Sequence, residues 1–468
     1  MRAEVPAPMS ARAEVLRSDL RAMTADGVFF SAMVGLGEVY VPAFALALGH
    51  GPADAGLLAT VPLLAGAFFQ LVTPEAVRRL RSYRRWVVAC ACLQALCFLP
   101  LAASALAGWG PLLWLLAVAS AYWGFGMATG PAWNAWVTTL VPARLRVRFF
   151  ARRSRSAQAA LLCALLLSGA LLEWCRRRGF ELVAFAALFT CAAGARWISS
   201  RFLARQSECP RAAESHRALP LRALPASLRG TSSARVLAYL LGMQLAAHIA
   251  APYFTPYMLG PLGLGYERFT ALIAASFLAR IAILPVLSHL AQRRGTRFIL
   301  IAGALGIVPL PTLWLVSDHF AYLLALQMAS GCAWAAVEYA SLLSFFEGID
   351  ERERASVLSF FNLANAAALT AGSLLGGVLL RNLGVGVGAY AWLFAASSLA
   401  RLAILPLLGR TASARVAPEE VSLRTLALRP AAGAVQRPIL ASVERAHEAR
   451  VRRSDAGSSR SSTPSPPP

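Results

Sequence analysis

The sequence contains no lysine, and few of its residues carry any charge. Asp, Glu and Arg make up 15% of the 468 residues, whereas about a quarter is usual in soluble domains. Apolar residues make up 57%, and the mean hydropathy is +0.57. So few charges cannot cover the surface of a water-soluble protein of this size, and so apolar a chain is not largely disordered. The composition therefore predicts a polytopic membrane protein.

The eight cysteines are too scattered to form a disulfide scaffold or a metal site. None belongs to a C-x-x-C pair, and most lie within apolar runs, so we interpret them as small apolar side chains of the core. The first 22 residues lack the apolar core of roughly 7–15 residues that a cleavable signal peptide needs. Without lysine no Walker A loop can exist, which excludes direct use of ATP by this chain. We predict no cofactor and no metal.

The net charge of +22 is carried by arginine alone. A charge of this size often indicates a nucleic-acid partner. Here the arginines cluster between apolar stretches and in the two tails, and no basic domain stands apart from the apolar segments. We therefore expect the lipid bilayer, and no nucleic acid, as the macromolecular surroundings of the protein.

Twelve stretches reach the length of about 20 mainly apolar residues that a transmembrane helix requires. They are 25–48, 54–73, 86–107, 111–140, 157–175, 180–199, 234–258, 268–290, 298–316, 320–347, 356–380 and 387–408. Helices satisfy their own backbone groups in lipid, and the alternating pattern of an outer-membrane barrel is absent. The predicted fold is an all-α polytopic membrane protein with 12 transmembrane helices.

Arginines gather in the even-numbered loops. They are Arg78, Arg79, Arg81, Arg84 and Arg85 after span two; Arg144, Arg146, Arg148, Arg152, Arg153 and Arg155 after span four; Arg201, Arg205, Arg211, Arg217, Arg222 and Arg229 after span six; and Arg293, Arg294 and Arg297 after span eight. The loops after spans one, three and nine have none. Basic loops stay in the cytoplasm, so we expect a multi-pass membrane protein with both termini cytoplasmic.

One loop contradicts this pattern. Arg176, Arg177 and Arg178 follow span five on the predicted outer side. Either that hairpin is shallow, or Glu173 and Glu181 offset the charge.

The spans divide into two related sets of six. We expect a cytoplasmic segment 1–24, a first bundle 25–199, a cytoplasmic inter-bundle loop 200–233, a second bundle 234–408 and a disordered basic tail 409–468. Arginine-bearing loops recur at matching places, at 78–85 and 291–297 and again at 141–148 and 348–354. Two pseudo-symmetric six-helix bundles are the architecture of carriers that work by alternating access.

Several polar side chains lie deep inside the predicted spans and form our candidate cavity. They are Glu38 in span one, Asn134 in span four, Gln244 and His248 in span seven, Arg280 in span eight, and Glu338 with Tyr339 in span ten. A charged side chain at a helix centre costs about 2.5–3.5 kcal/mol on insertion scales, so these groups should face protein or water.

Arg280 needs a carboxylate partner there, and Glu38 and Glu338 are the candidates. We hypothesise that one of them exchanges its pairing with Arg280 for a proton or a substrate. The alternatives are a fixed structural ion pair and, for His248, a neutral core histidine.

The chain resembles the major facilitator superfamily over about residues 20–410. The family's loop motif G-x-x-x-D-R-x-G-R-R is met in part. The matching gate-loop residues are Arg79, Arg84 and Arg85 in the first copy and Arg293, Gly295 and Arg297 in the second. Arg78 and Gln292 stand in place of the family's aspartate, and Arg81 stands in place of the glycine that follows it in the motif. The segment from Asn134 to Pro142 is similar to bacterial permeases of this family, which implies a place in the bacterial cytoplasmic (inner) membrane. The resemblance also implies that spans one, four, seven and ten line a central cavity.

These observations predict a secondary active transporter, not an enzyme. It would move a small organic solute by alternating access, coupled to a proton or ion gradient, and would act as a monomer. A non-transporting membrane sensor or scaffold remains the first alternative because both gate loops lack their acid. An integral membrane enzyme acting on lipid is the second, although no cluster of histidines, no paired carboxylates and no G-x-S-x-G motif are present.

Overall fold

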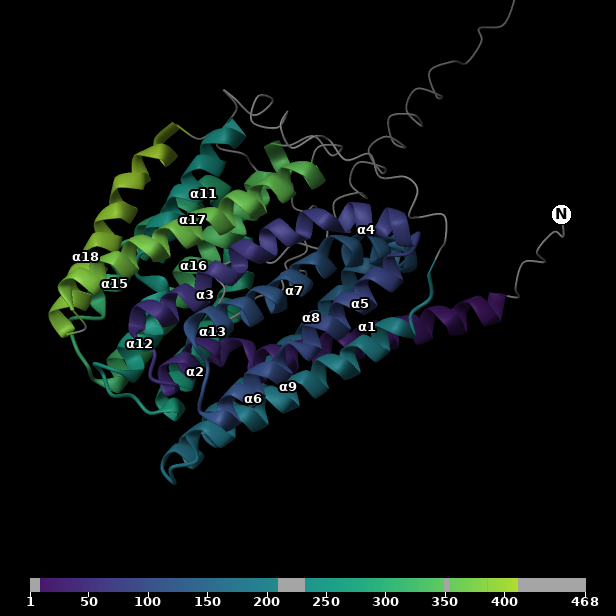
Figure 1. Ribbon diagram of the computed structural model, residues 1–468. Helices are drawn as coiled ribbons and strands as arrows, with labels where there is room; N and C mark the ends of the chain where they lie inside the picture. The colour runs from purple at the N-terminus through teal and green to yellow at the C-terminus, as the bar shows by residue number, and fades with distance from the viewer. Residues whose placement is uncertain (1–8, 209–231, 349–353, 385, 411–468) are drawn as a thin grey trace, which may run out of the picture.

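The computed structural model describes residues 9–208, 232–348, 354–384 and 386–410, and within these ranges the chain is entirely helical (Figure 1). Residues 1–8 of the predicted first segment, residues 209–231 of the inter-bundle loop and residues 411–468 of the tail lie outside the described residues. The all-α prediction is confirmed.

The first half of the chain supplies spans one to six. Its elements are α1 (Met9–Leu36), η1 (Glu38–Tyr40), α2 (Val41–Ala47), α3 (Pro52–Phe69), η2 (Gln70–Val72), α4 (Thr73–Leu80), α5 (Tyr83–Leu96), α6 (Phe98–Ala107), α7 (Leu112–Leu140), α8 (Ala143–Arg176) and α9 (Glu181–Ala204). The first helix begins at Met9, well before residue 25, where the apolar run starts.

The second half supplies spans seven to twelve. Its elements are α11 (Ser232–His248), η4 (Ala251–Tyr253), α12 (Phe254–Leu259), α13 (Tyr266–Arg294), α14 (Thr296–Ile307), α15 (Leu310–Leu313), α16 (Phe320–Gly348), α17 (Arg354–Leu383), α18 (Val387–Ile404) and η5 (Leu405–Arg410). In the described ranges, twelve segments are long and apolar enough to cross a membrane, as predicted.

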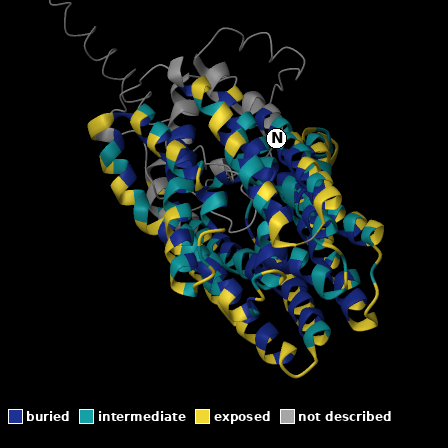
Figure 2. Cartoon of the chain, turned by 90° about the vertical axis from the view of Figure 1, so that its left-hand side faces the viewer, coloured by how far each residue is buried: buried dark blue, intermediate teal, exposed yellow. Residues whose placement is uncertain are grey.

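Large apolar side chains cover the outer faces of the helices. Leu113, Leu167 and Trp392 are each more than half exposed, and Figure 2 shows exposed positions along the outward faces with buried positions between the helices. An apolar outer surface of this extent suits acyl chains and not water.

The two halves lie side by side, the first in purple and blue and the second in green (Figure 1). They meet along two helix pairs, α3 with α17 and α8 with α13. Each pair joins one helix of each half, so the interface itself has a two-fold pattern.

Matching aromatic clusters show the internal repeat in detail. Phe44 of α2 meets Phe189 of α9 with ring centroids 5.0 Å apart and planes at 81°. In the second half, Tyr257 of α12 meets Phe394 of α18 at 5.1 Å and 82°. The third ring of each cluster is Phe185 in the first half, 5.3 Å from Phe44, and Tyr390 in the second, 5.0 Å from Tyr257. The same packing at the same places supports a duplicated bundle.

Spans one and seven are both broken in their second halves. A 3₁₀ turn separates α1 from α2 at Glu38–Tyr40, and another separates α11 from α12 at Ala251–Tyr253. Proline follows at position 42 in the first break and lies at position 252 in the second. A proline has no N–H to donate to the carbonyl four residues earlier, so the α-helix is interrupted. At both breaks, backbone groups in the interior of the protein lack their usual α-helical hydrogen bonds.

Candidate functional site

Glu38 lies in the break of span one and is buried. Its carboxylate accepts a hydrogen bond of 2.7 Å from the hydroxyl of Tyr122 on α7, and that hydroxyl is also 3.0 Å from the sulfur of Met33. The side chain is therefore held between spans one and four of the first bundle.

Arg280 and Glu338 form an ion pair between α13 and α16. One guanidinium nitrogen, Nη1, donates to both carboxylate oxygens at 2.8 and 3.1 Å. The side chains are 14% and 9% exposed. Of the two carboxylates that the sequence offered to Arg280, Glu338 is the one that binds it.

The backbones of α13 and α16 approach closely beside this pair. Gly331 of α16 packs against the carbonyl oxygen of Ser276. A Cβ atom added to Gly331 would lie only 2.2 Å from that oxygen. Ser276 lies one turn from Arg280, and Gly331 lies two turns from Glu338, so the contact and the ion pair share the same faces of the two helices. The close packing fixes the position of the pair.

Tyr339 and His248 are also buried. The hydroxyl of Tyr339 hydrogen-bonds Ser288, which lies on α13 as Arg280 does. The ring Nδ1 of His248 lies 3.0 Å from the carbonyl of Gln244, one turn earlier on α11. This contact is what the alternative of a core histidine, held within its own helix, predicts for this residue.

The predicted cavity residues thus fall into separate groups. Arg280, Glu338 and Tyr339 lie on the contact of α13 with α16, Gln244 and His248 share a face of α11, and Glu38 is held by Tyr122. Asn134 is half-buried on α7. No group of three or more His, Cys, Asp and Glu side chains suited to a metal ion occurs in the part of the chain that the structure describes.

The first gate loop receives a carboxylate from elsewhere in the chain. Glu208, which follows α9, accepts hydrogen bonds from the hydroxyl of Ser82 at 2.6 Å and from the backbone N–H of Arg84 at 3.1 Å. The N–H of Arg85 donates to Ser82 at 3.0 Å, so both groups cap the start of α5. The loop has no acid of its own at Arg78, yet its helix N-terminus has an anion.

Further contacts fasten the start of the inter-bundle loop to the first bundle. Asp19 of α1 accepts from the backbone N–H of Ser207 at 2.9 Å and from its hydroxyl, and Trp136 donates to the Ser207 carbonyl at 3.0 Å. Of the remaining gate-loop arginines, Arg79 pairs with Glu75 at 2.7 Å, Arg293 is exposed and Arg297 is half-buried. These contacts join the ends of spans one, three, four and six.

A second polar network crosses the same end of the first bundle. Arg153 of α8 pairs with Asp26 of α1 at 3.1 Å, and the hydroxyl of Ser199 donates to the other oxygen of Asp26 at 2.8 Å. Arg196 of α9 donates to Ser199 and to Gln94, each at 2.8 Å. Four spans of one bundle are joined through this network, in which Asp26, Gln94, Arg196 and Ser199 are almost completely buried and Arg153 is half-buried.

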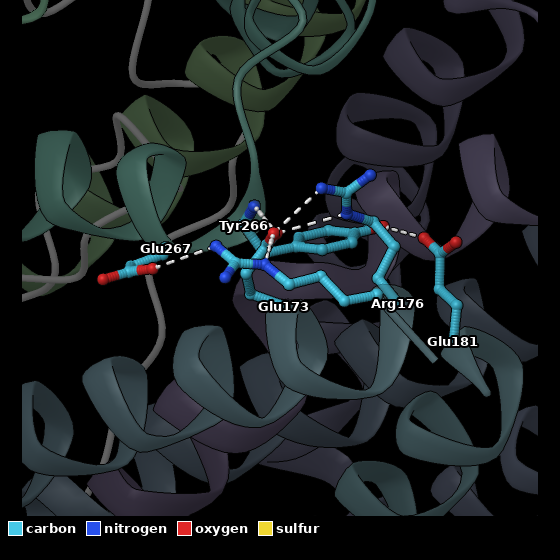
Figure 3. A network of polar contacts seen from close by, with 6 residues as sticks. Glu173, Arg176, Glu181, Tyr266 and Glu267 are labelled. Carbon is cyan, nitrogen blue, oxygen red and sulfur yellow. Dashed lines mark hydrogen bonds and ion pairs between the residues drawn. The ribbon is translucent and has the colours of Figure 1, made fainter. Parts of the chain in front are cut away.

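The two bundles are joined by polar contacts at the opposite end, which carries the odd-numbered loops. Figure 3 shows the larger group. Glu173 at the end of α8 accepts from Arg176 at 2.9 Å, from Arg177 at 2.8 Å, and from the backbone N–H of Tyr266 at the start of α13 at 3.0 Å. The hydroxyl of Tyr266 donates to Glu181 at 2.5 Å. We call these residues, together with Glu267, which lies 3.7 Å from Arg177, the Glu173 latch.

The Glu173 latch explains the basic loop after span five. Glu173 pairs with Arg176 and Arg177, Glu267 lies 3.7 Å from Arg177, and Arg178 stacks on Trp174 with the guanidinium carbon 3.8 Å from the ring centroid. With Glu173, Glu181 and Glu267 beside the three arginines, this end of span five carries little net positive charge, in line with the second of the two explanations.

A smaller contact joins the other helix pair at this end. Arg381 at the end of α17 pairs with Asp54 in the first turn of α3 at 3.3 Å. Deeper in, Tyr253 donates to the Ser373 carbonyl at 2.5 Å, and Ser373 donates to the Gly56 carbonyl at 3.1 Å. Tyr40, in the matching break of span one, bonds the Leu165 carbonyl at 2.8 Å and Thr270 at 2.9 Å. At the odd-loop end the two bundles are thus joined along both helix pairs.

Sequence reasoning missed several of these residues. Arg196 and Arg401 are charged groups inside predicted spans, so the argument that singled out Arg280 applies to them equally. They also share the repeat L-F-x-x-x-x-x-A-R, at 188–196 and 393–401. The roles of Tyr122 and Glu208 had no local signal, because their partners lie far away in the chain.

The comparisons with known proteins agree with this architecture. The family model described as "Major Facilitator Superfamily" matches residues 24–372. No curated protein matches the chain.

Solved structures of transporters share the fold. A mutant of the nucleoside transporter NupG is similar with a TM-score of 0.66 and 13% identity, covering 83% of this chain and 99% of that one. A bacterial homologue of the human lysosomal transporter Spinster, in an inward-facing and occupied conformation, is similar with a TM-score of 0.62 and 14% identity, covering 86% and 97%. At such low identity the likeness concerns the fold. The match of the family model over most of the sequence shows that the chain belongs to the Major Facilitator Superfamily.

Proposed function

We propose that this membrane transporter is a secondary carrier that moves a small organic solute by alternating access, driven by a proton or ion gradient. The observation that carries the proposal is the arrangement of the inter-bundle contacts. The described polar contacts between the bundles lie toward the odd-loop end and follow a two-fold pattern, with Asp54 and Arg381 on one helix pair and Glu173 and Tyr266 on the other. Two rigid halves joined at one end can rock to open the other.

The charge distribution supports an orientation for this conformation. The even-numbered loops carry the arginines, so the joined odd-loop end would face outward and the other end inward. The protein would then be inward-facing in the bacterial inner membrane, with both termini in the cytoplasm and with the monomer as the working unit.

The buried charges support coupling to a cation. Glu38 lies in the helix break of span one and accepts a hydrogen bond from Tyr122. Glu338 lies at the contact of α16 with α13 and is paired with Arg280. When the halves rock, a carboxylate that loses its donor must gain a proton or another cation, because a bare charge in an apolar interior is too costly. Neither group needs a cofactor, so we propose a carrier and not an enzyme.

The Glu208 contact argues against the alternative of a non-transporting sensor. That alternative rested on the missing acids of the gate loops, and Glu208 places a carboxylate at the first of these loops.

Counterflow in proteoliposomes tests the transport function directly. Solutes that stabilise the detergent-purified protein would be exchanged across the membrane, and the double variant Asp54→Cys with Arg381→Cys, once crosslinked, would stop the exchange by locking the closed end. Exchange that continues in the crosslinked protein, or no exchange of any stabilising solute, would reject the carrier.

Glu38→Gln tests the coupling role. We expect transport down a solute gradient to continue while its stimulation by a proton gradient is lost, because glutamine keeps the hydrogen bond with Tyr122 but cannot take up a proton. Glu14→Gln, an exposed position in the same span, is the matched control and should leave the stimulation unchanged. Unaltered proton dependence in Glu38→Gln would remove Glu38 from coupling.

A further inference from the structure

The guanidinium of Arg280 uses only one of its three nitrogens. Nη1 makes both bonds to Glu338, while Nε and Nη2 have no hydrogen-bond partner within the described part of the chain. These two nitrogens form the edge of the guanidinium that binds a carboxylate through two parallel N–H···O bonds. Arg280 thus retains a complete bidentate donor edge.

That edge must face water or a solute. Arg280 lies mid-way along α13, its side chain is 14% exposed, and donors turned toward acyl chains would be strongly unfavourable. The direction of the edge is also fixed, because Glu338 holds Nη1 and the contact at Gly331 holds the two helices together. A preorganised donor edge loses less entropy on binding than a mobile one.

The surroundings of the edge favour an apolar solute body. Trp334 is half-buried and lies one turn before Glu338, on the same face of α16. Phe277, one turn before Arg280 on α13, is a buried apolar side chain on the same face of that helix. A flat ring could lie against Trp334 while its acidic group reaches the arginine.

We propose that the solute is a small organic carboxylate with an apolar or aromatic body, held by the Nε and Nη2 edge of Arg280. This inference rests on the proposed carrier function and names the substrate class of the same cavity.

The arrangement gives the two members of the ion pair opposite roles. Arg280 attracts the solute carboxylate, whereas Glu338 repels it, because two carboxylates then share one guanidinium. A fixed structural ion pair would lose stability whichever member was removed. A solute site should instead lose affinity when Arg280 is changed and gain it when Glu338 is made neutral.

Binding is measured by thermal shift of the detergent-purified full chain with three matched probes: benzoate, its neutral amide benzamide, and phenylphosphonate as the other oxyanion. We expect stabilisation by benzoate and little effect of benzamide. Arg280→Gln should abolish the benzoate effect, and Arg280→Lys should weaken it by on the order of tenfold, because lysine keeps the charge but lacks the planar edge. Glu338→Gln should strengthen it severalfold.

Arg268→Gln is the control for loss of an arginine from the same helix, since Arg268 is exposed near the odd-loop end. It should bind benzoate as the unmodified protein does. Size-exclusion profiles establish that each variant is folded, and Arg280→Lys keeps the test valid should Arg280→Gln not fold.

The results separate this inference from the proposed function. Absence of a benzoate effect, equal effects of benzamide or phenylphosphonate, or weaker binding in Glu338→Gln would each overturn the carboxylate site, even if counterflow of another solute proves the carrier. Benzoate binding that depends on Arg280, without benzoate counterflow in proteoliposomes, would keep the site and reject the carrier.

Discussion

The two bundles place an arginine at the same position and treat it differently. Arg196 of span six and Arg401 of span twelve end the same L-F-x-x-x-x-x-A-R repeat, and both are almost completely buried. Arg196 belongs to a chain of polar groups that reaches Asp26 through Ser199. Arg401 donates to the carbonyls of Ile307 at 2.6 Å and Ala247 at 3.5 Å. No carboxylate contacts it among the residues that the structure describes.

The difference shows where each bundle holds its negative charge. By the spacing that relates Tyr40 to Tyr253, Asp26 corresponds to Tyr239, whose buried hydroxyl has no hydrogen-bond partner in the described ranges. The first bundle thus keeps a carboxylate near its even-loop end, whereas the second keeps Glu338 with Arg280 instead. The two bundles share their helix packing but not the placement of their charges. The first bundle therefore has the more extensive network of buried polar contacts.

Replacing each of the two arginines with leucine, in separate variants, should give the largest difference in stability between the bundles. Arg196→Leu removes donors from Gln94 and Ser199 and weakens the network at Asp26, at a cost of about 3 kcal/mol of stability. Arg401→Leu also removes a desolvated charge that has no counter-ion, so its net cost should be about 1 kcal/mol or less. Thermal unfolding in detergent measures both, and equal losses would contradict the idea that the bundles differ in charge balance.

The two inter-bundle contacts at the odd-loop end should also differ in strength. Glu173 is buried and accepts from three residues, whereas Arg381, the partner of Asp54, is 64% exposed. Glu173→Gln should favour opening of that end by about 2 kcal/mol, since a neutral amide cannot balance two arginines. Asp54→Asn should change the free energy of this opening by less than about 1 kcal/mol.

Hydrogen exchange of backbone amides measures this opening without labels. Exchange at residues 265–270 should rise strongly in Glu173→Gln, while exchange at residues 52–58 should rise only slightly in Asp54→Asn. The reverse order would mean that the α3 and α17 pair, and not the Glu173 latch, holds the end closed.

The span count and the repeat could be predicted from sequence because lipid imposes a simple rule on helix length and polarity. This rule says nothing about the structure of residues outside the apolar run. Helix α1 therefore starts earlier than predicted, and part of that extension is anchored by Asp19 on Ser207. Likewise, the apolar run continues on both sides of Glu38–Tyr40, although the helix is broken there, next to the proline at position 42.

The candidate site was predictable as a set of residues but not as a set of contacts. The cost of burying charge picked out Arg280, Glu338 and Glu38, yet it could not decide which carboxylate binds the arginine. That choice depends on how closely α16 approaches α13 at Gly331. Glu208 could not be foreseen either, because it reaches the first gate loop from the far side of four intervening spans.

The gate loops offer the finest comparison between the halves. Arg81 and Gly295 stand at corresponding positions after spans two and eight, and both have positive φ, at 49° and 81°. Arg81 lies in the left-handed helical region, where a side chain costs about 1–2 kcal/mol. Gly295 combines its φ with a ψ of 164°, a conformation that is essentially restricted to glycine.

Exchanging side chains at this position should therefore give small effects of opposite sign. Arg81→Gly relieves strain in the folded state but loosens the unfolded chain, so we expect a gain of about 1 kcal/mol or less. Gly295→Ala should cost at least about 1 kcal/mol. Unfolding midpoints in detergent report both values. A loss in Arg81→Gly would mean that the arginine side chain, and not the turn geometry, is what the first gate loop has kept.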